Sequence, residues 1–323
     1  MNKFALITVL ALSAMLVCAG CKEADSGFDK LSPSLIIEGL TVNNYPKVDG
    51  STSAAPLNTI IACKLFGIRY KWVSDYRNLR SVEPNLNKND TKKFLSLIKS
   101  SQTHESFINL IDKEADLILS ARKMSSDEKT YADAAGVSLI ETPIALDGFI
   151  FIVHPNNPIN SLTTAQIQDI YMGNITRWNE VGGGNYEIMP YIREANSGSQ
   201  ELMETLVMKD FDIADFPVSY WELVAFSMTG AFEAVLGNRD AICFTLYYYR
   251  EQIATGINIK TIAIDGIYPN RETISDNSYP YAAEVYAVIR SDLNTSSMAY
   301  KLYEWLQTKE GKQTINESGY VSN

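Results

Sequence analysis

Residues 48–56 read VDGSTSAAP, and this stretch decides how the first part of the chain is interpreted. It follows the apolar run LIIEGLTV and precedes LNTIIACKLFG, so it falls where a strand gives way to a helix. Pro56 suits the first helical turn, where its missing N–H is not needed. Ser51, Thr52 and Ser53 can cap the helix, and the free N–H groups beside them also favour an anion. The stretch therefore predicts either a capped turn or an anion site.

Residues 191–203, YIREANSGSQELM, form a second hydroxyl-rich turn of the same kind. A strand-like run leads into it, and a helix is expected to begin near Gly198. Ser197 and Ser199 then stand at the N-terminal turn of that helix, where N–H groups and the helix dipole attract negative charge. Arg193 lies just upstream and offers a planar, permanently charged group suited to a phosphate-like oxyanion.

A third turn, SSQTHESFINL at residues 100–110, places Thr103 or Ser106 at the start of another expected helix. Any one of these turns is explained by ordinary helix capping. Together they predict that several helix N-termini converge on one point, which would form an oxyanion pocket with little net charge on the protein.

Composition supports a folded protein that does not bind nucleic acid. The 323 residues are 46% hydrophobic and 20% charged, which is typical of globular proteins, and the length favours two lobes. The net charge of −10 argues against a nucleic-acid partner, because phosphate backbones need a basic surface.

Strand-like and helix-like segments alternate along the chain, which predicts an α/β fold with largely parallel sheets. The expected strands are residues 33–42, 115–121, 137–155 (interrupted by a turn), 187–192, 241–249 and 281–289. The expected helices are residues 56–67, 104–114, 125–136, 161–173, 198–208, 230–238 and 296–315.

The N-terminus has the pattern of a bacterial lipoprotein export signal. Lys3 precedes an apolar run at residues 4–17 that is too short to span a bilayer, and CAGC follows it. Cys21 would be the acylated residue, so residues 1–21 are expected to be a signal peptide and residues 22–34 a polar tether. Cys18 departs from the usual lipobox, and CAGC is formally also a C-x-x-C motif, although it lies in no redox or metal context.

The sequence contains no motif of an enzyme or a metal site. His104 and His154 have no second histidine or cysteine at metal spacing, and there is neither a G-x-S-x-G elbow nor a G-x-x-x-x-G-K loop. Cys63 and Cys243 lie in apolar segments and are expected to be buried free thiols. We therefore expect no catalytic residue, no metal and no cofactor.

From roughly residue 48 to residue 321 the chain resembles the phosphate-binding lipoprotein receptors of ABC importers, which are type II periplasmic-binding proteins. The resemblance is carried by DGSTSAAPL, EADLILSARKMSSDE, REANSGSQELM, AICFTLYYY, IDGIYPNRETISDNSYPYAAEVYAVI and, most specifically, residues 143–183. It implies a two-lobed fold, each lobe a mainly parallel sheet flanked by helices, joined by two crossover strands with the ligand between them. Lobe 1 would comprise residues 35–146 and 280–323, and lobe 2 residues 147–279.

The resemblance also implies which residues contact the ligand. They are Thr52, Ser53, Ala54, Thr103, Ser120, Arg193, Ser197, Gly198 and Ser199. A neighbour of Thr103 within QTHES (residues 102–106) is the alternative for the middle contact. Two departures concern selectivity, because family members commonly carry acids where this chain has Ala121 and Ala195. Such an acid accepts the proton that phosphate carries and sulfate lacks, so the sequence predicts weak discrimination between these anions.

The expected function is that of a solute-binding lipoprotein in the cell envelope, extracytoplasmic and facing either the periplasm or the cell surface. The protein would capture an oxyanion, with inorganic phosphate as the best single candidate, and deliver it to ABC permease subunits. It is expected to be a monomer. Two alternatives stay open at this point. One is a surface lipoprotein whose degenerate pocket makes it an interaction module, and the other is a phosphoesterase that uses Ser197 or Ser199.

Overall fold

The computed structural model describes residues 28, 31–216 and 227–322. The expected signal peptide, with Cys21, and most of the expected tether lie outside the described residues. These parts of the sequence prediction therefore stay expectations.

In the first part of the chain, elements alternate between strands and helices. They are η2 (Val42–Asn44), β1 (Val48–Gly50), η3 (Thr52–Ala54), α1 (Ala55–Leu65), β2 (Tyr70–Ser74), β3 (Arg80–Pro84), α2 (Lys88–Leu95), α3 (Thr103–Ile111), β4 (Leu117–Ser120), α4 (Ser126–Ala135) and β5 (Leu139–Val153).

Shorter elements lie between β5 and β11. They are β6 (Ser161–Leu162), α5 (Thr164–Tyr171), η4 (Trp178–Val181), β7 (Met189–Pro190), α6 (Gly198–Leu202), the π-helix η5 (Met203–Met208), α7 (Gly230–Gly237), β8 (Ala241–Leu246), the π-helix η7 (Tyr249–Ile253), β9 (Lys260–Thr261), β10 (Ala263–Ile264) and α8 (Arg271–Ser275). The last elements are β11 (Ala282–Arg290), α9 (Met298–Leu306), α10 (Lys309–Ser318) and β12 (Val321–Ser322).

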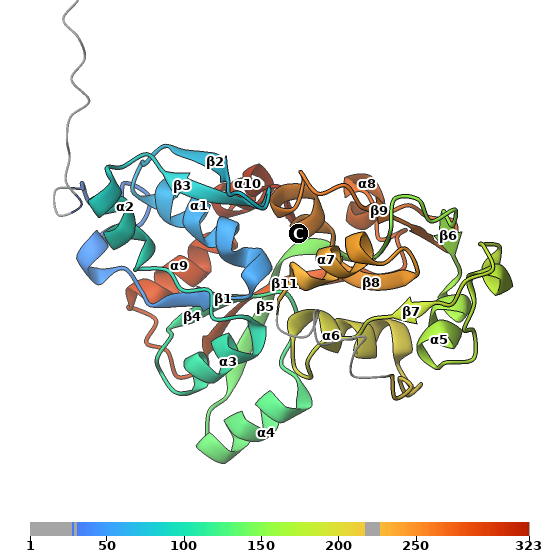
Figure 1. Cartoon of the computed structure of the whole chain (residues 1–323). Coiled ribbons are helices and arrows are strands. Elements are labelled where there is room, and N and C mark those ends of the chain that lie inside the picture. Colours follow the sequence, from blue (N-terminus) through green and yellow to red (C-terminus); the bar gives the residue numbers. More distant parts are fainter. Residues whose placement is uncertain (1–27, 29–30, 217–226, 323) are drawn as a thin grey trace, which may run out of the picture.

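One long strand, β5, belongs to both parts of the main sheet. Its residues 139–148 pair with β11, and its residues 149–153 pair with β8. We call β1–β4–β11 with residues 139–148 the first half-sheet, and β7–β8–β9 with residues 149–153 the second half-sheet. Figure 1 shows β5 and β11 in the middle of the molecule, with helices gathered on either side.

The α/β class is confirmed, and strand direction varies within the sheet. β1 pairs with β4 and β7 pairs with β8 in parallel, as alternating strands and helices predict. The pairings that involve β5 or β11 are antiparallel, which the alternation did not predict. β11 runs antiparallel to both of its neighbours, β4 and β5, and β5 runs antiparallel to β11 in the first half-sheet and to β8 in the second.

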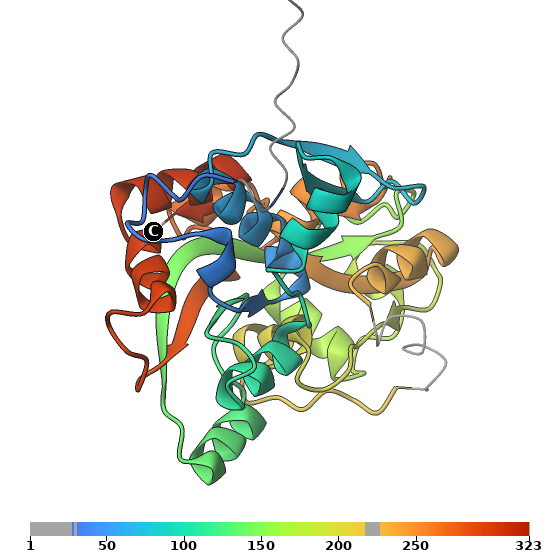
Figure 2. The ribbon, with the colours of Figure 1, turned by 90° about the vertical axis from the view of Figure 1, so that its left-hand side faces the viewer.

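Helices cover both faces of the first half-sheet. In Figures 1 and 2, α1 lies above and α3 below the β1–β4 pair, and α4 projects from the body in both views. A single cluster of buried apolar side chains runs through both half-sheets, so the fold has one large continuous core. A smaller cluster lies under α3 and contains Phe107, Leu110 and Ile118.

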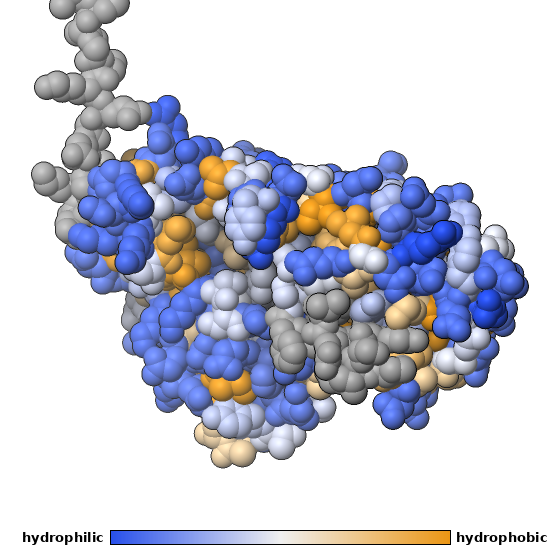
Figure 3. Space-filling view, in the orientation of Figure 1, coloured by the Kyte–Doolittle hydropathy of each residue, from blue (hydrophilic) through white to orange (hydrophobic). Residues whose placement is uncertain are grey.

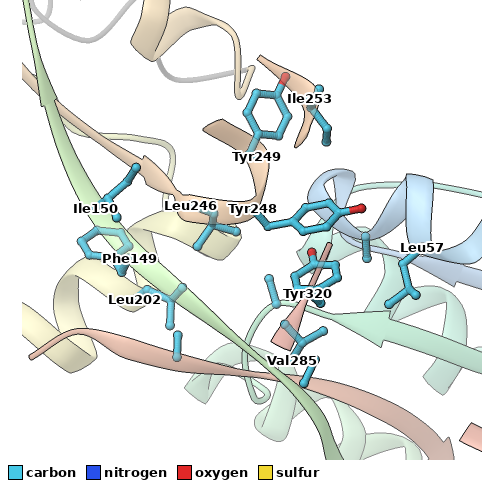
Figure 4. Packing of buried hydrophobic residues seen from close by; sticks show 14 of the residues in the cluster. Leu57, Phe149, Ile150, Leu202, Leu246, Tyr248, Tyr249, Ile253, Val285 and Tyr320 are labelled. Carbon is cyan, nitrogen blue, oxygen red and sulfur yellow. The ribbon is translucent and has the colours of Figure 1, made fainter. Parts of the chain in front are cut away.

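Asp147 occupies the point where β5 passes from one half-sheet to the other. Its carboxylate is buried, and Oδ1 accepts hydrogen bonds from the N–H groups of Gly148 and Tyr248 at 2.8 Å each. Among the described residues Oδ2 has no partner. The Tyr248 ring stacks on the Tyr320 ring with centroids 3.6 Å apart, and both rings point toward α1 in Figure 4. Burial raises the pKa of Asp147 to about 7.

The strand expected at residues 33–42 is absent. The chain turns there instead, because Ser34 Oγ accepts the N–H groups of Ile36 and Ile37, and such local bonds compete with strand pairing. Gly39 adds a backbone angle φ of +80°, which suits glycine and breaks an extended run.

Two other expected boundaries are wrong. The turn expected within residues 137–155 does not form, because β5 continues unbroken through Pro143 and Gly148 and is fully buried over its last seven residues. The expected helix at residues 296–315 divides into α9 and α10, since Thr308 caps the second helix by accepting the N–H of Gly311.

Several local predictions are confirmed. α4 begins after the Ser125 cap and ends at Gly136, and α5 carries a capping box between Thr163 and Gln166. Cys63 and Cys243 are buried and free. Burial raises the pKa of the Cys63 thiol to about 12, so it stays protonated at neutral pH.

The surface in Figure 3 is mainly hydrophilic, with separate apolar patches. Strongly exposed large apolar side chains, such as Leu35 and Tyr76, lie far apart in the sequence. In the described part of the chain, every helix is too short or too polar to cross a bilayer.

We expect Asp147→Asn to remove a pH dependence of stability. The folded-state pKa of about 7 lies above the unfolded value near 3.8, so the stability present below about pH 4 is lost as pH rises through 7. Between about pH 4 and pH 8 this single group lowers the free energy of unfolding of the wild type by on the order of 4 kcal/mol. Urea unfolding between about pH 4.5 and pH 8 measures it, with exposed Asp133→Asn as the control. Equal pH slopes in Asp147→Asn and wild type would contradict this assignment.

Candidate functional site

A cavity of about 370 Å³ opens where segments of both half-sheets meet. By liquid volume it holds about a dozen water molecules. It is lined by Ser51, Thr52, Ser53, Ser101, Gln102, Thr103, His104, Glu105, Ala121, Arg193, Glu194, Ala195, Ser197, Gly198, Ser199, Met228 and Leu246. Most of these side chains are hydroxyl-bearing or charged, and those come from three separate segments, residues 51–53, 101–105 and 193–199.

The turn between β1 and α1 is fixed by Ser51. The Ser51 N–H donates to the Leu119 carbonyl at 2.9 Å, which continues the pairing of β1 with β4. Its buried Oγ accepts the N–H of Ala121 at 3.0 Å and lies 2.9 Å from Thr103 Oγ1. Ser51 therefore ties the first turn to the end of β4 and to the start of α3.

Asp49 holds the turn before α3 in place. This carboxylate is fully buried, and its Oδ1 accepts the N–H groups of Gly50 at 2.8 Å and Ser101 at 2.9 Å. Its Oδ2 accepts from Asn109 Nδ2 at 2.9 Å, one and a half turns into α3. The acid of the DGSTS stretch therefore positions the residues around the cavity and does not line it.

The start of α6 lies against the start of α3. A Cβ atom on Gly198 would meet Thr103 Oγ1 at 2.5 Å, a distance that real Cβ atoms do not show, so this contact requires glycine. α3 packs on β1 and β4 of the first half-sheet, whereas α6 packs on β8 of the second. Two helix N-termini from opposite half-sheets thus meet at one wall of the cavity.

Arg193 brings a buried positive charge to the cavity. Only 8% of this residue is exposed, and its Nη1 donates to the Ser227 carbonyl at 3.1 Å and to Met228 Sδ at 3.4 Å. Within the described residues no carboxylate forms an ion pair with Arg193, and its Nε has no partner. Burial lowers the pKa of the guanidinium to about 10, which still leaves it charged at neutral pH.

Ser199 adds a second buried donor without a partner. Its Oγ is buried and makes no hydrogen bond to any described residue. Arg193 and Ser199 are therefore two buried donors that line one cavity and have no hydrogen-bond partner for Nε and Oγ among the described residues. An anion with several oxygens would satisfy both groups and would balance the guanidinium charge.

His104 connects the cavity wall to a buried ion pair. Its Nδ1 lies 2.9 Å from Glu128 Oε1. Glu128 is fully buried and accepts Arg122 Nη1 at 2.7 Å and Nη2 at 2.8 Å, and the Ser125 N–H at 2.8 Å. The imidazole of His104 is therefore anchored by a carboxylate that Arg122 already neutralises.

Two hydrogen bonds reach from the β4–α4 region to the loop before α6. Arg122 Nη2 donates to the Asn196 carbonyl at 2.6 Å, and Asn196 Nδ2 donates to Asp127 Oδ2 at 2.9 Å. Asn196 has φ of +64°, in the left-handed region that asparagine tolerates. These bonds set the position of the loop that carries Ser197 and Ser199.

The structure places seven of the nine residues implied by the resemblance in the cavity wall: Thr52, Ser53, Thr103, Arg193, Ser197, Gly198 and Ser199. Ala54 and Ser120 lie outside it. The Ala54 N–H donates to the Ser51 carbonyl at 2.9 Å, and Ser120 Oγ donates to the Arg122 carbonyl at 2.6 Å. In this conformation both groups are engaged within the protein, because each completes a local turn.

Sequence reasoning named Ser51 only as a possible cap in an anion-favouring turn, and His104 only as a neighbour of Thr103; the contact of α3 with β4 brings both into the cavity wall. Sequence reasoning missed other lining residues. Met228 and Leu246 carry no sequence signal that separates them from ordinary core residues. In the described chain, no cluster of three histidine, cysteine or carboxylate residues could hold a metal ion.

Comparisons with known proteins identify the family of the chain. Residues 82–310 match the model of the PBP superfamily domain. The chain is 23% identical to a phosphate-binding protein PstS of Staphylococcus epidermidis over 334 residues, covering 100% of this chain and 90% of the relative. It is 26% identical to that of Borreliella burgdorferi over 186 residues, covering 56% of this chain and 65% of the relative.

Solved structures share the fold. A Clostridium perfringens ABC transporter substrate-binding protein with bound phosphate superposes with a TM-score of 0.58 at 21% identity, covering 85% of this chain and 98% of that one. An ABC-type phosphate transport receptor from Vibrio cholerae gives 0.57 at 22% identity with the same coverage.

We expect Asp49→Ala to lower the free energy of unfolding by about 3 kcal/mol, because it leaves the Ser101 N–H and Asn109 Nδ2 without their buried acceptor. Urea unfolding measures the loss. Asp133→Ala, which removes an exposed acid, is the matched control and should stay within about 0.5 kcal/mol of wild type. A loss no larger than that of the control would show that Asp49 does not hold this turn.

Proposed function

This chain belongs to the PBP superfamily, and from that premise we propose that it is a solute-binding protein that captures inorganic phosphate or a similar oxyanion for an ABC importer. The observation that carries the proposal is Arg193, a buried guanidinium without a carboxylate partner among the described residues, in a cavity between two half-sheets. The names of the S. epidermidis and B. burgdorferi relatives support phosphate as the anion.

The cavity chemistry suits a small tetrahedral anion. Arg193 supplies charge, Ser199 supplies an unpaired hydroxyl, and Thr103 and Ser197 stand at helix starts where N–H groups favour negative charge. An anion held this way is desolvated and sees mainly nearby dipoles, so the overall charge of −10 does not oppose binding.

We propose that residues 35–146 with 280–323 form one lobe and residues 147–279 the other, and that the lobes close on the ligand. β5 supports this division, because its pairing partner changes from β11 to β8 between residues 148 and 149. The bonds from Arg122 and Asp127 to Asn196 support the closed arrangement. Permease subunits would recognise the closed, liganded form.

The location and the anchor are also proposals. The signal-like N-terminus supports an extracytoplasmic, lipid-anchored protein acylated at Cys21, monomeric and held at the membrane in the periplasm or at the cell surface. An enzymatic role is less well supported: Ser197 Oγ accepts the Gln200 N–H, and no general base contacts Ser199 among the described residues. A pure interaction module would leave the buried charge of Arg193 unexplained.

Arg193→Ala should abolish oxyanion binding while the fold stays intact. Truncating one member of a buried charge pair costs on the order of 2–5 kcal/mol, so affinity falls by at least about 30-fold. Calorimetric titration with phosphate, sulfate and arsenate measures this, and circular dichroism checks the fold. Arg239→Ala removes an exposed arginine of the same half-sheet region and should bind as wild type does. If Arg193→Ala binds these oxyanions with unchanged affinity, the proposed site is wrong.

Asp127→Ala should weaken phosphate binding by about two- to tenfold, because it removes one hydrogen bond that favours the closed arrangement. Asp127→Asn keeps an acceptor oxygen for Asn196 and should bind nearly as wild type does. Stopped-flow release rates should rise in the alanine variant only. If both variants release phosphate at the wild-type rate, this contact does not contribute to closure.

A further inference from the structure

We propose that His104 reads the protonation state of the ligand and so selects hydrogen phosphate or hydrogen arsenate over sulfate. The inference rests on the proposed function. Ala121 and Ala195 line the same cavity, but their side chains cannot accept a hydrogen bond. His104 would supply the fixed hydrogen-bond acceptor in their place.

The hydrogen bond to Glu128 sets the tautomer of His104. Glu128 is fully buried and held by Arg122 and the Ser125 N–H, so its carboxylate acts as an acceptor and Nδ1 of the imidazole carries the hydrogen. Nε2 then carries a lone pair, and no described residue bonds to it.

The geometry around Glu128 leaves Nε2 as the acceptor side of the ring. Arg122 forms an ion pair with Glu128, so the charge of the carboxylate that holds His104 is balanced within the protein. Nδ1 is engaged with Glu128, and Nε2 is the ring atom that can accept a hydrogen bond from a ligand.

Hydroxyl groups cannot make this selection. Each hydroxyl group of Thr103, Ser197 and Ser199 carries one hydrogen and two lone pairs, so each can donate to a bare oxygen or accept from a protonated one. They would bind sulfate and hydrogen phosphate almost equally. Only an acceptor that cannot also donate penalises an anion without a proton.

Two lining carboxylates are the competing acceptors. Glu105 and Glu194 are both exposed, and among the described residues neither side chain is held by a hydrogen bond or an ion pair. An acceptor that no other group holds turns away from sulfate at little cost. The side chain of His104 is 40% exposed, but its ring is held by Glu128 and cannot turn away without losing that bond.

The test compares phosphate and sulfate affinity at about pH 8, where inorganic phosphate carries one proton, by calorimetry on the purified chain. We expect wild type to prefer phosphate. His104→Asn can still donate to Glu128 from the Nδ1 position but has no atom at the Nε2 position, so its preference should fall by about ten- to a hundredfold. His104→Gln places an amide oxygen near the Nε2 position and should keep part of the preference.

Glu105→Gln and Glu194→Gln are the matched controls and should leave the preference unchanged. Thermal unfolding of each variant separates loss of fold from loss of selectivity, because a structural role would weaken both anions equally. A wild-type preference that survives in His104→Asn, or that vanishes in Glu194→Gln or Glu105→Gln, overturns the role of His104 and leaves the proposed function standing. Failure of wild type to bind either anion overturns both.

Discussion

A single shared strand constrains the arrangement of the whole molecule. β5 pairs with β11 over residues 139–148 and with β8 over residues 149–153, so both half-sheets are built on one continuous backbone. Three cavity-lining segments follow strands of this sheet: residues 51–53 follow β1, Ala121 follows β4 and residues 193–199 follow β7. The buried carboxylate of Asp147 sits where the change of partner occurs, and the stacked rings of Tyr248 and Tyr320 pack beside it. The shared strand therefore brings turns that are distant in sequence to one place.

The cavity departs from the usual rule that buried polar groups are paired. Arg193 keeps a buried charge without a carboxylate partner among the described residues, and Ser199 keeps an unpaired hydroxyl. Each of these unpaired buried groups lowers the stability of the unliganded protein. An anion that bonds to both would regain that stability. The supporting carboxylates around them are hydrogen-bonded through both oxygens: Asp49 and Glu128 each accept three or more hydrogen bonds. Rigid surroundings around unsatisfied donors are what a binding site requires.

Local sequence signals predicted local structure well and long-range structure poorly. The helices expected at residues 125–136 and 161–173 were predicted, because the signals that start and stop a helix lie within or beside the helix itself. The strand expected at residues 33–42 does not form, because Ser34 Oγ accepts hydrogen bonds from the N–H groups of Ile36 and Ile37. The pattern of apolar residues gives no information about this competing interaction. The antiparallel pairings of β5 and β11 were also not predicted by the alternation of elements, since direction follows from how the chain crosses between half-sheets.

For the candidate site, the sequence by itself determined which turns carry hydroxyl groups next to helix starts and that Arg193 stands beside one of them. Those features are local, so periodicity, capping and residue chemistry reveal them. Tertiary structure alone decided that Thr103 and Gly198 touch, that Arg193 is buried without a counter-charge in the described chain, and that Glu128 holds His104. These facts depend on contacts between residues up to about a hundred positions apart, and only the folded core, by excluding water and fixing those distances, brings them about.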